Sequence, residues 1–172
     1  EISQKLADSI NGDINNYCLV KQDEERNKYS FTEEGLYVKS LVEKWKNSKQ
    51  WYTDRGIRYY RGCCIYSKPG LGKSSLINEI TKRLELPLYI FDLSSMTNRE
   101  FIGKVDRLSK MPGLILFEDF DCIFNKRDNI NKTEERGGLT FDCFINKLSG
   151  AQAVENKYVF ITTNHLEALD PA

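Results

Sequence analysis

The sequence has a single histidine, His165, and its cysteines form no C-x-x-C pair. Zinc sites need several histidine or cysteine ligands at close spacing, so this scarcity argues against a zinc domain. The five cysteines are odd in number, and four of them lie within apolar runs: Cys63, Cys64, Cys122 and Cys143. We therefore expect reduced, buried cysteines in an intracellular compartment rather than a disulfide framework.

The sequence also lacks a surplus of charge and any long apolar stretch. Its 25 Lys and Arg residues balance 25 Asp and Glu residues, whereas general nucleic-acid-binding domains carry a basic excess, so we expect no nucleic-acid partner. Uninterrupted apolar runs such as 114–117 are far shorter than the roughly 20 residues that span a bilayer. No secretory signal is visible, and we expect a piece of a longer protein.

What is present is a globular composition with alternating patterns. The chain has 172 residues, 40% of them apolar and 29% charged, enough for one domain with a core. Short apolar runs that predict strands fall at 62–66, 87–93, 113–118 and 157–162, and helical patterns fall at 73–84, 98–110 and 138–149. Alternating strands and helices predict a three-layer α/β fold with a predominantly parallel sheet.

The segments outside the alternating pattern are an N-terminal stretch, one further helix and two loops. Residues 1–32 are polar, and we expect either a linker or the edge of a preceding domain, with the main domain at 33–172. Thr32 is a candidate N-cap for a helix whose apolar positions are Leu36, Leu41, Val42 and Trp45. We expect loops at 51–57, which carries two aromatic residues, and at 125–138, which is charged.

A glycine-containing loop between a predicted strand and a predicted helix is the most informative feature. It reads Ser67-Lys68-Pro69-Gly70-Leu71-Gly72-Lys73-Ser74-Ser75, and the strict phosphate-binding pattern G-x-x-x-x-G-K-[ST] fails only at Ser67. Backbone N–H groups in such a loop converge on phosphate oxygens at a helix N-terminus. The side chain of Lys73 would reach the β- and γ-phosphates, and the hydroxyl of Ser74 would bind Mg²⁺. The alternative is an ordinary Pro-Gly turn before a helix.

Two further predicted strands end in polar residues. The run 113–117 is followed by Glu118, Asp119 and Asp121, and three carboxylates in four residues are more than a polar turn requires. Beside a phosphate-binding loop, such carboxylates hold the water shell of Mg²⁺ and orient the attacking water. The run 158–161 is followed by two threonines and Asn164, which either contacts a γ-phosphate or caps a helix.

These three elements, in this order, resemble the Walker A, Walker B and sensor 1 elements of an AAA ATPase. Their neighbours are similar to the mitochondrial chaperone family that translocates the Rieske iron–sulfur protein into respiratory complex III. The resemblance covers about residues 33 to 172 and rests on Trp51-Tyr52-Thr53-Asp54-Arg55-Gly56-Ile57, Tyr60-Arg61-Gly62, Glu118-Asp119-Phe120-Asp121, Gly138-Leu139-Thr140-Phe141, Thr162-Thr163-Asn164-His165 and Leu169-Asp170-Pro171-Ala172.

The resemblance implies ATP and Mg²⁺ as cofactors and a role for each site residue. Glu118 would be the metal carboxylate, Asp119 the catalytic carboxylate and Asn164 sensor 1. The nucleotide would be bound by Pro69, Gly70, Leu71, Gly72, Lys73, Ser74 and Ser75, and Ser74 would be a metal ligand. The resemblance also implies a homo-oligomeric ring, a hexamer or heptamer, that acts on a protein substrate at the mitochondrial inner membrane. The protein would meet that membrane only through a segment outside this chain.

The chain departs from the family pattern in ways that bear on turnover. Ser67 replaces a glycine and Lys68 a proline, Arg58 stands in place of a proline, and Ser149 in place of an aspartate. A Cβ at position 67 could strain the turn after the strand. The arginine-rich segment and small helical lid of the family lie beyond Ala172, so this piece is expected to bind nucleotide better than it hydrolyses it.

Two other functions remain open on the sequence. One is a nucleotide-dependent scaffold without useful turnover. The other is an unfoldase that threads peptides, in which Phe101-Ile102-Gly103 would form an aromatic pore loop. We favour the simpler interpretation that Phe101 and Ile102 begin a helix and face the core.

Overall fold

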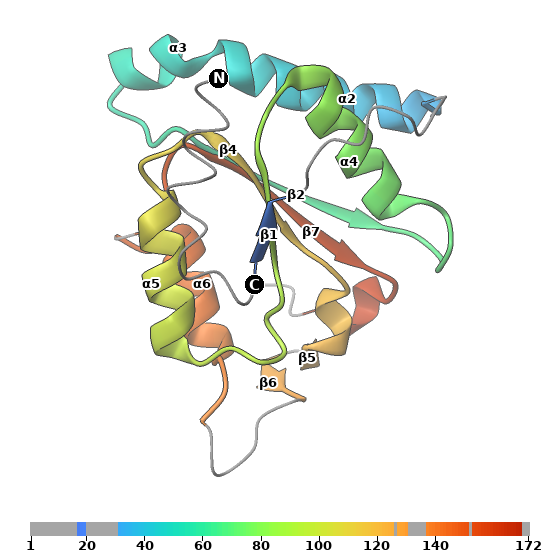
Figure 1. Cartoon of the computed structure of the whole chain (residues 1–172), viewed down its shortest axis with the longest axis vertical. Coiled ribbons are helices and arrows are strands. Elements are labelled where there is room, and N and C mark those ends of the chain that lie inside the picture. The colour runs from blue at the N-terminus through green and yellow to red at the C-terminus, as the bar shows by residue number, and fades with distance from the viewer. Residues whose placement is uncertain (1–16, 20–30, 126, 131–136, 152, 170–172) are drawn as a thin grey trace.

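The computed structural model describes residues 17–19, 31–125, 127–130, 137–151 and 153–169; most of 1–32, part of 125–138 and the terminal 170–172 therefore lie outside it. Its main sheet has five strands in the order β1-β3-β4-β7-β2 (Figure 1). Their bounds are Tyr17–Leu19, Leu88–Phe91, Gly113–Phe117, Lys157–Thr163 and Tyr60–Tyr66. Only β1, which pairs with β3, is antiparallel. The predicted parallel sheet is confirmed.

Helices cover both faces of this sheet and make three layers (Figure 1). One face carries α2, α3 and α4, and the other carries α5 and α6. Their bounds are Glu33–Asn47, Lys49–Asp54, Lys73–Leu84, Asn98–Leu108 and Phe141–Ser149. The helix predicted at 73–84 has those bounds, whereas the one predicted at 138–149 begins three residues later, after Thr140 caps its N-terminus.

Alternation along β4 explains why the core has two halves. Leu114 and Leu116 pack with α2 and α4, while Ile115 and Phe117 pack with α5 and α6. All five residues of β4 are buried, as a central strand covered on both faces requires. The apolar run around 113–118 was therefore sufficient to predict a buried strand.

Side-chain caps define where three helices begin. The hydroxyls of Thr32, Thr97 and Thr140 each accept a hydrogen bond from a backbone N–H in the first turn of the next helix. Thr97 and Glu100 form a reciprocal capping box. Each cap pairs an N–H group that the helix itself leaves without a partner.

Several local predictions were wrong. Residues 51–54 of the loop expected at 51–57 belong to α3, in which Tyr52 is buried against α2 and α4. The expected loop 125–138 contributes to a small hairpin of β5 (Phe124–Asn125) and β6 (Asp128–Asn129). Leu36 is 53% exposed rather than buried. Cys64 and Cys122 are exposed, whereas Cys63 and Cys143 are partly buried.

The register of the parallel strands sets the position of the functional site. Tyr66 pairs with Thr163, Phe117 with Ile161 and Phe91 with Phe117, so β2, β7, β4 and β3 all end at the same edge of the sheet. The segments that follow these strands carry the predicted site residues. None of the helices in the described ranges is long and apolar enough to cross a membrane.

At the opposite edge of the sheet, the first residue of β7 is a buried lysine. Lys157 is 0% exposed, and its Nζ donates to the carbonyl oxygens of Leu108 at 2.6 Å, Asn156 at 3.4 Å and Met111. These bonds tie β7 to the C-terminal end of α5. Burial lowers the pKa of the Lys157 ammonium to about 7.

This buried lysine gives the protein a pH-dependent stability. The unfolded chain keeps the proton to about pH 10, whereas the folded chain releases it near pH 7, so stability rises as the pH increases through 7. Between pH 6 and pH 8 the free energy of unfolding should rise by about 1 kcal/mol more in the wild type than in Lys157→Met. Urea unfolding at both pH values measures this, and equal pH dependence in the two proteins would contradict it.

Candidate functional site

The loop between β2 and α4 has the backbone of a phosphate-binding loop. Gly70 and Gly72 have φ angles of 79° and 82°, in the left-handed region that favours glycine. Helix α4 begins directly after them at Lys73, so its unpaired N–H groups lie beside the loop. Pro69 and Leu71 complete the loop and Ser74 and Ser75 belong to the first turn of α4, which is the arrangement that the sequence predicted.

Ser67, which departs from the strict pattern, does not need a glycine's backbone. Among the described residues, the non-glycine residues with positive φ are Glu85, Asp119 and Asn156. The N–H of Ser67 donates to the carbonyl oxygen of Thr163, which continues the pairing of β2 with β7. Its carbonyl oxygen and its hydroxyl lie 3.2 and 3.5 Å from Nζ of Lys73. The strain that the sequence suggested at this position is therefore absent from the backbone.

Ser74 and Glu118 lie in direct contact. The hydroxyl of Ser74 donates to Oε1 of Glu118, across the gap between the start of α4 and the end of β4. A hydroxyl and a carboxylate are oxygen ligands of the kind that Mg²⁺ prefers, and Mg²⁺ commonly takes one or two protein ligands plus phosphates and waters. No cluster of three or more His, Cys, Asp or Glu side chains that could hold a metal occurs in the described residues. This pair therefore fits a nucleotide-bound Mg²⁺ better than a metal held by protein alone.

Asn164 joins the phosphate-binding loop to residues 118–121, the acidic turn that follows β4. Its Oδ1 accepts a hydrogen bond from Nζ of Lys73 at 2.6 Å, and its Nδ2 donates to Oδ1 of Asp119 at 3.2 Å. Lys73, Asp119 and Asn164 come from three separate segments, and the structure brings them together as the sequence predicted. The carboxamide thus lies between a cation and a carboxylate, with both of its ends used.

Asp119 has a backbone that few residues other than glycine adopt. Its φ and ψ angles are 44° and 52°, in the left-handed region, and its N–H donates to Oγ1 of Thr162 at 3.1 Å. Strained backbone of this kind persists only where neighbouring contacts hold it. The hydroxyl of Thr162, which is buried in β7, supplies such a contact.

Asp121 lies beside Asn164, although the sequence analysis gave it no role apart from that of the three carboxylates as a group. Its Oδ1 accepts hydrogen bonds from Oγ1 of Thr163 at 2.6 Å and from the N–H of Asn164 at 3.0 Å. Partial burial by itself raises the pKa of this carboxyl, but hydrogen bonds from Thr163 and backbone N–H groups, with the nearby His165, lower it overall. The signal in the sequence was the third carboxylate after β4, opposite the two threonines that end β7.

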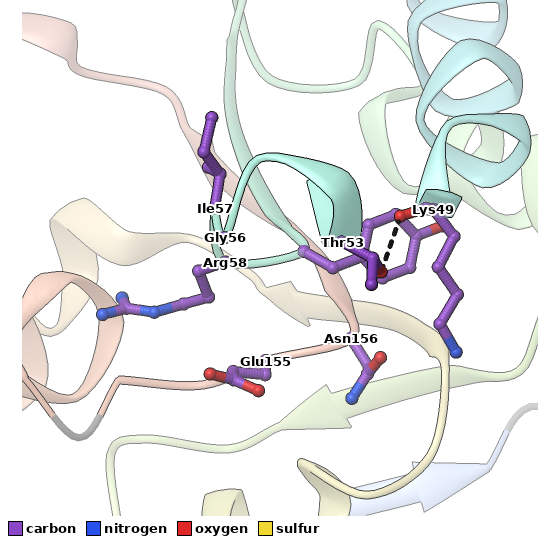
Figure 2. Close-up of a pocket in the computed structure, with 8 residues that line it drawn as sticks. Lys49, Thr53, Gly56, Ile57, Arg58, Glu155 and Asn156 are labelled. Atoms are coloured by element: carbon purple, nitrogen blue, oxygen red, sulfur yellow. Dashed lines mark hydrogen bonds between the residues drawn. The ribbon is translucent and has the colours of Figure 1, made fainter. Parts of the chain in front are cut away.

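A pocket of about 460 Å³ lies elsewhere, beside residues that precede β2 and β7 (Figure 2). Lys49 and Thr53 of α3 contribute to its lining together with Arg58, Glu155 and Asn156. Because these residues lie at the amino ends of the strands, the pocket contains none of the predicted site residues. The guanidinium of Arg58, one of the departures from the family pattern, donates to the carbonyl oxygen of Gly150. Gly150 follows Ser149, which is another of those departures.

Phe101 does not form a pore loop in this structure. It lies in the first turns of α5, is 0% exposed, and packs against the rings of Phe91, Phe117 and Phe144. The interpretation of Phe101 as a core residue is confirmed. For Ile102 that interpretation was wrong, because its side chain is 40% exposed.

Comparisons with known proteins agree with this geometry. The model of the family described as "ATPase family associated with various cellular activities (AAA)" matches residues 63–172. The mitochondrial chaperone BCS1 of Homo sapiens is 38% identical over 136 residues, which are 76% of this chain and 32% of that protein. The probable mitochondrial chaperone BCS1-A of Dictyostelium discoideum is 36% identical over 141 residues, 78% of this chain and 32% of that protein.

A more distant relative is an AAA-ATPase of Arabidopsis thaliana, 28% identical over 142 residues, 74% of this chain and 30% of that protein. The chain thus spans about a third of the length of these curated relatives. The phosphate-loop backbone and the mostly parallel sheet are those of an α/β P-loop NTPase. The family match covers the loop and all of the sheet except β1 and the first three residues of β2. The chain therefore belongs to the AAA family of ATPases.

Proposed function

We propose that this domain binds ATP with Mg²⁺ and hydrolyses the bond between the β- and γ-phosphates. The observation that carries the proposal is the position of Asn164, whose carboxamide contacts both Lys73 and Asp119. A phosphate-binding cation, a carboxylate and an amide thereby converge at the carboxyl edge of a parallel sheet, where ligands of such folds bind.

The loop 67–75 would hold the triphosphate. Backbone N–H groups of residues 69–75 would donate to phosphate oxygens, and the start of α4 favours negative charge there. Nζ of Lys73 would leave Asn164 and the carbonyl of Ser67 to contact the β- and γ-phosphates. ATP binding is then an exchange of partners at Lys73.

Ser74 and Glu118 would hold Mg²⁺ in place of the hydrogen bond that now joins them. A bound Mg²⁺ supplies neutralisation of the charge on the phosphate oxygens. The Ser74 hydroxyl would serve as a direct ligand, and the Glu118 carboxylate would hold the ion's water shell.

Asp119 and Asn164 would act on the attacking water. The Asp119 carboxylate, exposed within the acidic turn, would orient the water and accept its proton. The water oxygen forms a bond to the γ-phosphorus while the bond to the β–γ bridging oxygen breaks, and ADP leaves. The amide of Asn164 would donate to the γ-phosphate or to the water as charge shifts.

The wider role that we propose is that of a chaperone or translocase for a protein substrate. We propose that it acts as a homo-oligomeric ring of six or seven subunits. The names of the relatives, mitochondrial chaperones BCS1, support this assignment and a mitochondrial location. The family resemblance of the motifs adds assembly of a respiratory complex and the inner membrane, reached through a segment outside this chain. Burial of Phe101 gives the peptide-threading alternative no support.

Phosphate release by the full-length protein tests the catalytic proposal. Asp119→Asn should lower kcat about 100-fold or more with little change in ATP affinity, because it removes the proton acceptor and leaves the phosphate contacts. Lys73→Ala should weaken ATP binding itself. Asp142→Asn, an exposed change in the first turn of α6, is the matched control and should behave as wild type.

Unchanged phosphate release in Asp119→Asn would remove Asp119 from the catalytic role. Wild-type protein that assembles on ATP and releases no phosphate would identify the scaffold alternative instead. Native mass spectrometry of the same samples with ATP determines the number of subunits.

Ser67→Gly tests the one departure in the loop. Because the φ angle of Ser67 is not positive and its carbonyl oxygen is the closer contact to Lys73, the glycine variant should turn over ATP within about twofold of wild type. Steady-state phosphate release measures this. An increase of about tenfold would show that the serine limits the reaction despite its relaxed backbone.

A further inference from the structure

We propose that Asp121 is a positioning residue that fixes the backbone of Asn164 while leaving its carboxamide free to exchange Lys73 and Asp119 for the γ-phosphate and the attacking water. The proposal rests on the proposed function, since it assigns a second residue to the same reaction. It concerns how the amide is held, not which group attacks the phosphate.

The first observation is the pair of hydrogen bonds that Asp121 accepts. Both come from the end of β7: one from Oγ1 of Thr163 at 2.6 Å and one from the N–H of Asn164 at 3.0 Å. Asn164 lies one residue beyond the last sheet residue, so its N–H has no place in the β7 ladder. A carboxylate from the acidic turn supplies the missing acceptor, and hydrogen bonds to charged groups are among the stronger ones.

The second observation is that the other side of Asn164 is also tied. The N–H of His165 donates to Oγ1 of Thr163 at 3.0 Å, and Thr163 is 0% exposed. One hydroxyl therefore links the Asp121 carboxylate to the peptide that follows Asn164. The backbone is held on both sides by a buried side chain and a carboxylate.

The third observation is that the backbone and the side chain of Asn164 have different partners. Its backbone N–H contacts Asp121, whereas the hydrogen bonds of its carboxamide go to Lys73 and Asp119. Those two side chains are the ones that would meet phosphate and water. The amide can therefore exchange partners by rotation about its own side-chain bonds, without movement of the strand. Displacement of a catalytic group by about 1 Å can lower a rate about 100-fold, so such anchoring matters.

Variants of Asp121 and Thr163 in the full-length protein test this role. Asp121→Ala should lower kcat for phosphate release about 10- to 100-fold while the dissociation constant for ATP stays near wild type. Asp121→Asn keeps an acceptor oxygen without the charge, so its kcat should lie between those of the wild type and Asp121→Ala. Thr163→Val should lower kcat, whereas Thr163→Ser, which keeps the hydroxyl, should restore it. Asp142→Asn is again the surface control.

Two results of these activity and binding measurements would overturn the proposal. One is a kcat of Asp121→Ala within about twofold of wild type. The other is a loss of ATP affinity and thermal stability in proportion to the loss of kcat, as a merely structural residue would give. Because a hydrogen bond joins Asp121 to Thr163, the effects of Asp121→Ala and Thr163→Val should also be less than additive.

A second measurement separates this proposal from the proposed function. Hydrogen exchange of the backbone N–H of Asn164, measured without nucleotide, should accelerate in Asp121→Ala and remain slow in Asp142→Asn. If the wild type hydrolyses no ATP, the catalytic proposal fails, and the exchange rates still decide whether Asp121 holds this amide. Equal exchange in Asp121→Ala and wild type would overturn the positioning role.

Discussion

The parallel pairing of β2, β7 and β4 is the constraint on which the site depends, because it brings the ends of three strands to one edge of the sheet. The chain then needs only short segments beyond those ends to join Lys73, Asp119 and Asn164. The carboxamide of Asn164 is the meeting point, with its oxygen on the cation and its nitrogen on the carboxylate. A slip of β7 by one residue would place the side chain of position 164 on the other face of the sheet and separate all three groups.

The acidic turn after β4 depends on the same strand. Asp119 keeps its left-handed backbone because Thr162 accepts its N–H, and Asp121 is bonded to Thr163 and Asn164. The last two residues of β7 and Asn164 thus hold the acidic turn through the N–H of Asp119 and the carboxylate of Asp121. Since Thr162 and Thr163 are buried, packing restricts the positions of their hydroxyls. The hydrogen bonds of these hydroxyls therefore hold the turn in place against the core.

Features set by short stretches of sequence could be predicted, and features set by distant partners could not. The phosphate loop and α4 follow from Gly70, Gly72 and the apolar spacing after Lys73, all within twenty residues. Helix α3 escaped prediction because six residues carry no clear period and Tyr52 is buried by neighbours outside the segment. The contacts of Asp121 escaped because its partners lie more than forty residues later, and a run of carboxylates does not show which strand it faces.

The partners of Lys73 have a consequence for the affinity of the site. Its ammonium has an amide oxygen at 2.6 Å and a carbonyl oxygen at 3.2 Å, and phosphate oxygens would have to replace both. On the proposed function, the loss of these two contacts offsets part of the attraction between Lys73 and the phosphates, so ATP would bind less tightly than it would to a lysine without such partners.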